Sequence, residues 1–341
     1  MTPFAILLAT AVQAAAPAPG DLRTFTDWTM GCDNARVCQA VALVPEAEDG
    51  DHYLMLVLRR DAAAAALARL TLPIPDAVAR GTKLSLAVDG KVLAQVVAPG
   101  KGGGLALPFQ GTLAEALMEG KQVTLADPRG RKIAHASLAG LAATALAIDE
   151  AQRRIGTRTA LRRPGAAPAS QVPPPPALPV VQQPAVTGRP PRTLSVKDAT
   201  RLIGAEAAVC DYATGPVAPK AYRLDATHSL VTIDHPCGNG AYNLYTSLFV
   251  VPDKGRPVPA VLDAPSGFGE APDNQVVTGG WDARTRRLTS YVRARGIGDC
   301  GSHQSFAWDG ARFRLVEQSL MGECRGSVDY ITTWRARVVV N

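Results

Sequence analysis

Six cysteines form three pairs that are close in sequence, namely Cys32 with Cys38, Cys210 with Cys237 and Cys300 with Cys324. An even number of cysteines at short separations is typical of disulfides in proteins of an oxidising compartment. Redox catalysis instead favours a C-x-x-C spacing, which none of the three pairs has. The pattern therefore predicts three structural disulfides, each closing a short or medium loop within one part of the chain.

The amino terminus predicts export. Residues 4–12 are apolar, and small residues follow as far as Ala16. This run is too short to span a bilayer, which needs roughly 20 residues, but it fits the apolar region of a signal peptide. We expect a signal peptide over residues 1–16, no transmembrane segment, and a periplasmic or secreted protein. The alternative is a disordered alanine-rich amino terminus.

A proline-rich stretch divides the chain. Between residues 163 and 192, ten of thirty residues are proline. Such a run favours extended polyproline II and acts as a semi-rigid spacer. We expect a first domain over residues 21–159, a disordered linker over 160–192 that holds the domains tens of ångströms apart, and a second domain over 193–341.

The basic charge is concentrated around this stretch. Residues 151–197 hold eight Lys and Arg and no Asp or Glu, so the rest of the chain carries a formal charge of −2 against +6 for the whole. Nucleic-acid binding favours basic residues on a folded face with aromatics among them, and this segment has no aromatic residue. We interpret it as a solvated linker, with weak attraction to an anionic surface as the alternative, and expect no nucleic-acid partner.

Both domains are predicted to be mainly β. In the first, apolar segments and turn residues predict strands at 25–32, 41–44, 53–59, 67–74, 83–88, 91–98, 123–126 and 132–137, with a hairpin turn at Asp89-Gly90. Helices are expected at 112–120, with Thr112 as N-cap, and at 138–155. These elements indicate a β-sandwich with a flanking helix.

The second domain opens with a helix capped by Ser195 and then turns to β-structure. Three segments share one rhythm, in which an apolar residue precedes Asp225, Asp282 or Asp309, a polar turn follows, and an apolar strand returns. An Asp side chain can close such a turn on the backbone. We expect three hairpins of an antiparallel β-sheet domain.

Several local motifs together resemble a known family. They are Trp28…Cys32…Cys38, residues 238–243 after Cys237, residues 298–301, residues 306–310 and residues 333–336. This combination resembles the bacterial domain-of-unknown-function family 1176. The first domain, with its 72–75 strand, Asp89-Gly90 turn and 137–141 helix entry, is similar to the invasion-associated locus B proteins. The resemblance implies an exported, β-rich envelope protein and supplies no catalytic residues.

Metal binding is the first alternative role for the cysteines. Cys237, Cys300, His228, His235 and His303 lie in one domain, and Cys300 and His303 have a C-x-x-H spacing. Zinc sites use such ligands four at a time. A cysteine cannot serve a disulfide and a metal together, so we expect no metal site and no cofactor.

A hydrolytic site is the second alternative. Asp299 and Glu323 each adjoin a cysteine of one predicted disulfide, and paired carboxylates can act as acid and base. With His303 and Tyr242 they form the candidate binding surface. The four tryptophans, Trp28, Trp281, Trp308 and Trp334, are interpreted as core residues. The alternative is a glycan or peptide groove of exposed Trp and Tyr, to which Tyr242, Tyr245 and Tyr291 would contribute.

The sequence favours a non-catalytic exported envelope protein that binds another envelope protein or a cell-wall polymer. The alternative is an envelope hydrolase, or an inhibitor of one, that acts near Asp299, His303 and Glu323. A convergent pocket of those three residues favours the enzyme, whereas a flat or apolar surface favours the binding protein.

Overall fold

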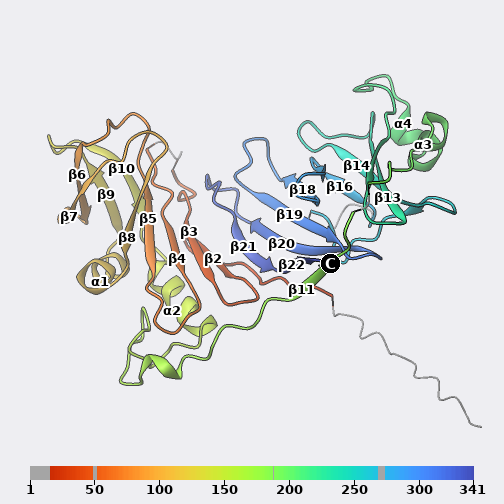
Figure 1. Ribbon diagram of the computed structural model, residues 1–341. Helices are drawn as coiled ribbons and strands as arrows, with labels where there is room; N and C mark the ends of the chain where they lie inside the picture. Colours follow the sequence, from red (N-terminus) through yellow and green to blue (C-terminus); the bar gives the residue numbers. More distant parts are fainter. Residues whose placement is uncertain (1–15, 49–51, 187, 268–272) are drawn as a thin grey trace, which may run out of the picture.

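The structure is a computed structural model that describes residues 16–48, 52–186, 188–267 and 273–341. The predicted signal peptide falls on residues 1–16, so all of it except Ala16 lies outside the described residues. We refer to residues 16–159 as the first half and to 193–341 as the second half; they lie left and right in Figure 1.

The first half contains two antiparallel sheets. One has six strands in the order β1-β2-β3-β4-β5-β8, and the other has four in the order β10-β9-β6-β7. The elements are β1 Arg23–Phe25, β2 Trp28–Cys32, β3 Cys38–Ala42, β4 Val57–Arg60, β5 Arg69–Pro73, β6 Lys83–Val88, β7 Lys91–Val97, β8 Gly104–Pro108, α1 Gly111–Glu119, β9 Gln122–Ala126, β10 Lys132–Ser137 and α2 Leu141–Ala151. Both sheets and both helices contribute to one core that includes Trp28, Leu58, Leu86, Leu117 and Ile148.

Local turn chemistry explains several of these elements. Asp89 and Gly90 both have positive φ, as a two-residue hairpin turn requires, and they join β6 to β7 as predicted. The helix expected at 112–120 is α1, but its N-cap is Gln110, which makes no side-chain cap bond. The prediction of Thr112 as N-cap is therefore wrong: the helix begins one residue earlier, at Gly111.

The second half is also mainly β. One five-stranded sheet has the order β12-β13-β14-β15, with β16 paired to β14, and the other has the order β17-β18-β19-β20-β21. The elements are α3 Val196–Ile203, α4 Ala205–Ala208, β12 Lys220–Arg223, β13 His228–Asp234, β14 Tyr245–Pro252, β15 Val258–Pro259, β16 Gln275–Val277, β17 Gly280–Asp282, β18 Arg287–Arg293, β19 Gly301–Trp308, β20 Phe313–Met321, β21 Ile331–Arg335 and β22 Arg337–Val340. The two sheets share a core that includes Leu230, Leu288 and Trp308, and α3 packs on the other face of β13 and β14.

The three predicted hairpins are present. Asp225, Asp282 and Asp309 each accept backbone N–H groups of the residues two and three positions further on, which closes the turn. The turns join β12 to β13, β17 to β18, and β19 to β20. Ser195 caps α3 by accepting from the backbone N–H of Asp198 at 3.1 Å, as predicted.

Part of the proline-rich segment is ordered, and one strand of it pairs with the second half. Ala169–Gln171 forms the single-turn 3₁₀-helix η1, and Val180–Gln183 forms strand β11, which pairs in parallel with β22. Val181 is buried with Ala307 of β19 and Val316 of β20. The expectation of disorder over the whole of 160–192 is therefore wrong for this stretch, because every second side chain of β11, namely Val181 and Gln183, is buried against the sheet edge.

The segment before the prolines is also more structured than its charge suggests. Arg154, interpreted from sequence as a solvated linker residue, is fully buried. Its guanidinium donates to the carbonyl oxygens of Ala62, Ala63 and Ala64 at 3.2, 2.6 and 2.7 Å. Asp149 accepts the backbone N–H groups of Leu161 and Arg162, both at 2.8 Å. These bonds fold residues 154–162 back onto α2.

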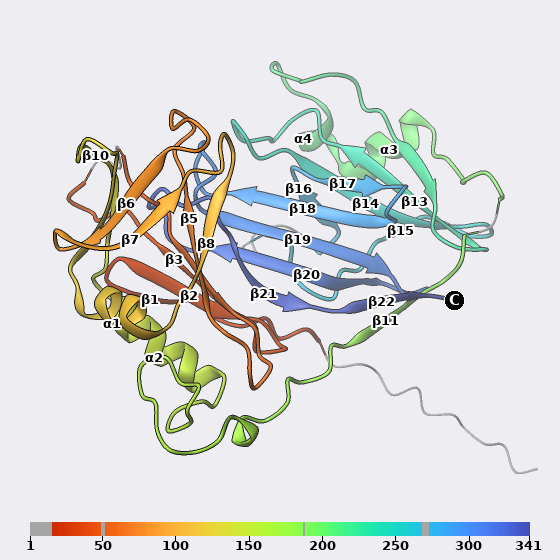
Figure 2. The same cartoon turned by 60° about the vertical axis from the view of Figure 1, so that its left-hand side comes forward.

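The two halves meet along an apolar seam, formed by Leu22, Val41, Leu43, Cys300, Met321, Tyr330 and Ile331. Figure 2 shows β21 of the second half beside β2 and β3 of the first. Gly20 lies in the same place, where its N–H donates to the carbonyl of Thr333 at 3.0 Å. A Cβ at Gly20 would lie 2.2 Å from the Cys32 carbonyl oxygen, so this close approach requires glycine.

Polar contacts flank the seam. Asn34 Nδ2 donates to the carbonyl of Arg335, and Arg335 N–H donates to Asn34 Oδ1, both at 2.9 Å. Arg325 donates to Asp27 Oδ1 at 2.5 Å and to the carbonyl of Val44 at 2.7 Å. Because the halves touch through these groups, the expectation that a spacer holds them tens of ångströms apart is wrong. The division into two domains stays a prediction.

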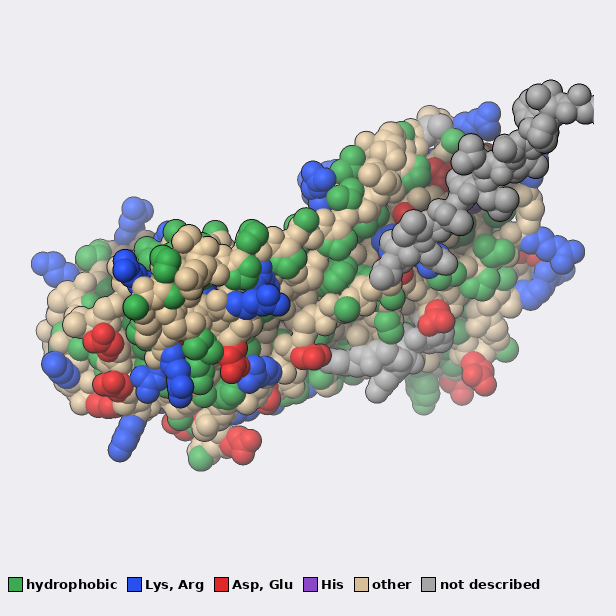
Figure 3. Space-filling view, turned by 90° about the horizontal axis from the view of Figure 1, so that it is seen from below, with side chains coloured by type: hydrophobic (Ala, Val, Ile, Leu, Met, Phe, Trp, Pro, Cys, Tyr) green, Lys and Arg blue, Asp and Glu red, His purple; other side chains and the backbone are tan. Residues whose placement is uncertain are grey.

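The charged side chains on the face seen in Figure 3 are dispersed, with Lys and Arg lying among Asp and Glu. Trp28 and Trp308 are buried, and Trp281 and Trp334 are partly buried against the core of the second half. The tryptophans thus pack in the cores, as the sequence favoured.

Candidate functional site

The cysteines form the three predicted disulfides. Their Cα atoms are 4.0 Å apart for Cys32–Cys38, 6.0 Å for Cys210–Cys237 and 4.8 Å for Cys300–Cys324. The first joins paired positions of β2 and β3, and the third fastens the start of β19 to the loop after β20. All six cysteines are therefore structural, and Cys237 and Cys300, the candidate ligands of the metal alternative, belong to disulfides.

The histidines of the suggested metal set have other partners. His228 Nδ1 lies 3.0 Å from Asp225 Oδ1, His235 Nε2 lies 2.8 Å from Ser247 Oγ, and His303 packs against the Tyr291 ring. Within the described ranges, no three His, Cys, Asp or Glu residues are grouped as metal ligands.

Asp299 braces the loop that precedes β19. Its carboxylate is buried, accepts from Arg295 Nε at 2.6 Å, and accepts the backbone N–H of Gly326 at 2.7 Å. The hydrogen bond from the Arg295 guanidinium lowers the pKa of this carboxyl below its usual range. Asp299 therefore holds a fixed negative charge that ties loop 294–299 to loop 322–330.

Glu323 and His303 have other partners. Glu323 Oε1 accepts from the Thr24 hydroxyl at 2.8 Å, across the boundary between the halves. His303 lies on β19 opposite Tyr291 of β18, with ring centroids 6.2 Å apart. Asp299, His303 and Glu323 thus each bind a separate group and form no shared acid–base arrangement.

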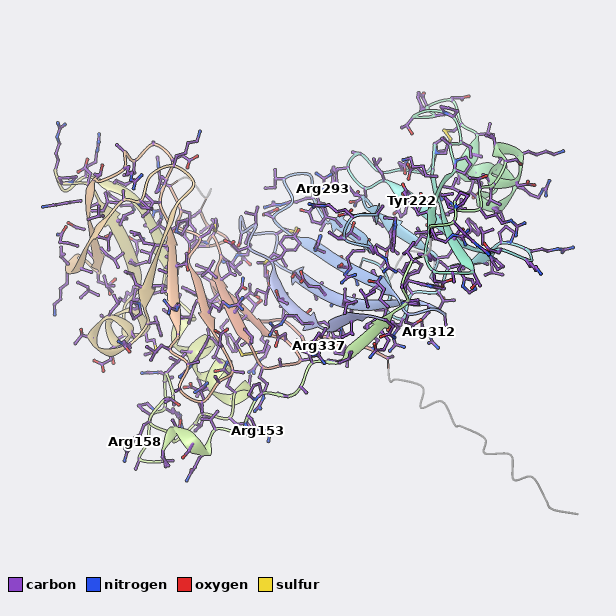
Figure 4. All side chains as sticks on the ribbon, viewed as in Figure 1. Arg153, Arg158, Tyr222, Arg293, Arg312 and Arg337 are labelled. Atoms are coloured by element: carbon purple, nitrogen blue, oxygen red, sulfur yellow. A yellow bond between two sulfur atoms is a disulfide. The ribbon has the colours of Figure 1, made fainter. Side chains whose placement is uncertain are left out.

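Tyr242 belongs to a stack of rings and one guanidinium. The Arg293 guanidinium lies 5.6 Å from the Tyr242 ring centroid and 5.7 Å from that of Tyr291, both within cation–π range. Tyr291 in turn lies 6.0 Å from Tyr330. Arg293 is labelled at the upper end of β18 in Figure 4. The structure therefore links Tyr242 and His303 through Arg293 and Tyr291, but not through direct contact.

Two exposed apolar side chains project from the loops beside this stack. Ile297 is 72 % exposed and Val328 is 66 % exposed. Their loops are tied together, because the Tyr330 hydroxyl donates to the Gly298 carbonyl at 3.1 Å and Asp299 binds Gly326. We call the surface made by Tyr242, Arg293, Ile297 and Val328 the loop rim.

A groove of about 510 Å³ borders the loop rim between the two halves. Arg295, Ile297 and Arg325 line it from the second half, and Glu46, Glu48, Val44, Pro45 and Met55 line it from the first. Its walls thus pair basic groups with acidic ones around apolar atoms. Sequence reasoning missed Ile297, although an exposed apolar residue between Gly296 and Gly298 is a recognisable signal for a loop contact.

A second cavity, of about 520 Å³, lies at the other side of the second half. Lys220, Asp234, His235, Tyr245 and Thr246 supply its polar lining, and the Cys210–Cys237 disulfide lies beside it. Sequence reasoning singled out His235 and Tyr245 but did not place them together, since they come from different strands.

No helix in the described part of the chain is both long and apolar enough to cross a membrane.

The chain is thus a mainly β protein with three disulfides, each between cysteines close in sequence. Such disulfides are typical of proteins from oxidising compartments. The chain belongs to the family described as "Protein of unknown function (DUF1176)", which matches residues 22–340. It is 30 % identical over 362 residues to the uncharacterized protein YpfG of Escherichia coli (strain K12), covering 98 % of this chain and 97 % of that protein.

A solved structure is also similar to part of the chain. It is the crystal structure of invasion associated protein B from Bartonella henselae, which is 18 % identical and covers 39 % of this chain and 98 % of its own, with a TM-score of 0.31.

Proposed function

We propose that this protein is an exported, periplasmic envelope protein that binds a partner protein without catalysing a reaction. Three disulfides support an oxidising compartment. The apolar run and small residues at 4–16 support a cleaved signal peptide.

The loop rim is the observation that carries this proposal. Ile297 and Val328 are large apolar residues held in solvent on loops that a disulfide, a salt bridge and hydrogen bonds all brace. Arg and Tyr beside them are the residue types enriched at protein interfaces. A braced loop that presents apolar side chains lowers the entropic cost of binding, since little has to be ordered on association.

The groove beside the loop rim suggests the kind of partner. Glu46 is exposed, and Glu48 is partly exposed while it binds His135 Nε2 at 2.9 Å. On the opposite wall, the Arg295 and Arg325 guanidiniums already pair with Asp299 and Asp27. The acidic wall is therefore the one with unused charge. A partner segment with a basic side chain and apolar neighbours matches it, which favours a protein over an uncharged polymer at this surface.

The hydrolase alternative has less support. Asp299 is neutralised by Arg295, Glu323 binds Thr24, and His303 faces Tyr291. The cavity next to them is lined by Arg295, Ile297 and Cys324 instead of by the three candidate residues. An apolar rim is the outcome that favours a binding protein.

We also propose that residues 21–159 and 193–341 are two domains connected by 160–192. Separate apolar cores in the two halves support this division, and the seam joins them in the folded protein.

Affinity capture from periplasmic extract tests the binding proposal. The full chain is expected to retain a discrete partner protein, and Ile297→Asp and Val328→Asp are expected to lose it. Val196→Asp is the matched control, because Val196 is 56 % exposed in the first turn of α3, where an acidic residue is tolerated. Retention of the same partner by both rim variants, or its loss in Val196→Asp, would contradict the proposal.

A further inference from the structure

The cavity beside the Cys210–Cys237 disulfide has the features of a built ligand site. It opens where β12 and β14 begin and β13 ends, and its volume of about 520 Å³ lies within the range of small-molecule pockets. It is lined by residues of the β12–β14 sheet and of neighbouring loops, and it shares no lining residue with the groove at the loop rim.

The charged groups of the cavity form a neutral pair. Lys220 Nζ donates to Asp234 Oδ2 at 2.8 Å, and the Thr246 hydroxyl donates to Asp234 Oδ1 at 2.8 Å. Both members of the pair are about half exposed, so they face the solvent of the cavity. An ammonium has three donors and a carboxylate has about four acceptor positions, so each retains hydrogen-bonding capacity.

This pair presents a donor and an acceptor side by side. The two hydroxyls of a vicinal diol are separated by about the distance between Lys220 Nζ and Asp234 Oδ2. Each hydroxyl can accept from the ammonium or donate to the carboxylate without separating the two charges. A charged ligand would be attracted by one member of the pair and repelled by the other, so the cavity favours a neutral, hydroxyl-rich ligand that can bind both.

Two aromatic rings form one wall of the site. The rings of His235 and Tyr245 lie 6.4 Å apart and are inclined by 35°. Aromatic faces are electron-rich and attract the polarised C–H groups on the face of a sugar ring. Burial lowers the pKa of His235, so this wall carries no positive charge at neutral pH.

The wall is also held in place before any ligand binds. Asn239 Nδ2 donates to the His235 carbonyl at 2.7 Å, and Tyr245 N–H donates to Asn239 Oδ1 at 2.8 Å. The His235 ring is held by a hydrogen bond between its Nε2 and the hydroxyl of Ser247, which is buried. Cys237, which follows Pro236 in the chain, is fixed by its disulfide to Cys210. A site built in this way loses little conformational freedom when it is filled.

We propose that this cavity binds a neutral saccharide, with a vicinal diol bridging Lys220 and Asp234 and the sugar-ring face against Tyr245 and His235. The site is separate from the loop rim and would give the protein a second class of ligand. Binding requires no covalent step, and Ser247, which is 3 % exposed, stays out of contact with the sugar.

Saturation-transfer NMR and calorimetry with the full, oxidised chain test this proposal. The probes are chitobiose, cellobiose and maltose, each at millimolar concentration, together with the dipeptide D-alanyl-D-alanine as a zwitterionic comparison. At least one disaccharide is expected to bind saturably, with its ring protons closest to the protein. Binding of the dipeptide alone, or of no disaccharide, would overturn the proposal.

Variants locate the binding. Asp234→Asn and Lys220→Gln are expected to raise the dissociation constant about tenfold or more, since each removes a charged hydrogen-bond partner. Tyr245→Leu removes the ring and is expected to weaken binding, whereas Tyr245→Phe keeps the ring and is expected to retain it. Lys254→Gln is the control, because Lys254 is exposed outside the cavity. Unchanged affinity in Asp234→Asn, with the fold intact by circular dichroism, would contradict the assignment.

A control on the ligand distinguishes recognition of the diol from nonspecific binding. The binding disaccharide is oxidised with periodate and reduced with borohydride, which cleaves its vicinal diols, and is expected to lose binding. Equal binding of the cleaved product would refute the diol contact even if the variants behaved as expected.

Discussion

The apolar seam between the two halves can be tested with Ile331→Ala. Ile331 is fully buried, and it belongs to the same cluster as Val41 and Leu43 of the first half. Truncating a buried Ile removes contact area and leaves a cavity, which costs about 2–5 kcal/mol. If the halves were held apart by a spacer, Ile331 would lie near solvent, where substitutions change stability by roughly 0.5 kcal/mol or less.

Urea unfolding of the full chain with disulfides intact measures this difference, followed by tryptophan fluorescence and circular dichroism. We expect Ile331→Ala to lower the free energy of unfolding of the second half by about 2–5 kcal/mol. Ile155→Ala makes the same chemical change at a position that is about half exposed after α2, and is expected to have a small effect. Equal, small effects of both substitutions would refute a packed seam.

Three further predictions concern the stability contributed by Asp299, His235 and Arg154. The hydrogen bond from Arg295 lowers the pKa of Asp299 in the folded protein, so the unfolded state takes up a proton at this position at higher pH. Stability is therefore expected to fall as pH drops below about 4, and Asp299→Asn is expected to reduce that dependence, as measured by urea midpoints across pH. Burial lowers the pKa of His235, so stability is expected to decline as pH falls below about 6.5, less so in His235→Gln. Arg154→Met removes the donor of three carbonyls, one buried and two partly buried, and is expected to cost about 3 kcal/mol in thermal or urea unfolding.

The disulfides give another measurable outcome. Alkylation of the native protein is expected to label none of the six cysteines without reduction and all six after it. Free thiols in the native protein would contradict both the three disulfides and the proposed oxidising compartment.

Elements set by local chemistry were predictable from sequence. The Asp89-Gly90 turn and the turns closed by Asp225, Asp282 and Asp309 depend on side chains that bond to their own neighbouring backbone or tolerate positive φ. The cysteine pairs were predictable for a similar reason, since each joins positions separated by at most 27 residues.

Features that depend on contacts across the chain were not predictable. Arg154 reads as one of a run of basic residues, and only the fold shows that it caps the carbonyls of residues 62–64. The sequence holds one weak indication of the seam. Residues 40–44 are a continuous apolar run, which indicates a strand buried on both faces. One face of β3 meets the core of the first half, and the other meets the second half.

The candidate site shows the same division. Asp299 was correctly placed beside Cys300, but its pairing with Arg295 and Gly326 makes it a brace and not an acid. His235 and Tyr245 were read separately because they lie 10 positions apart in sequence, with a turn segment between them. The pairing of β13 with β14 and the hydrogen bond from the His235 N–H to the Tyr245 carbonyl bring them together.

Photo-crosslinking from the loop rim in living cells tests the proposed function most directly. A photoreactive phenylalanine derivative replaces Ile297 in the full chain, and the same residue at exposed Val196 serves as the comparison. We expect one discrete protein to be joined to the chain from position 297 and not from position 196. Crosslinks that are absent at 297, or that are the same at both positions, would contradict a protein-binding role for the loop rim.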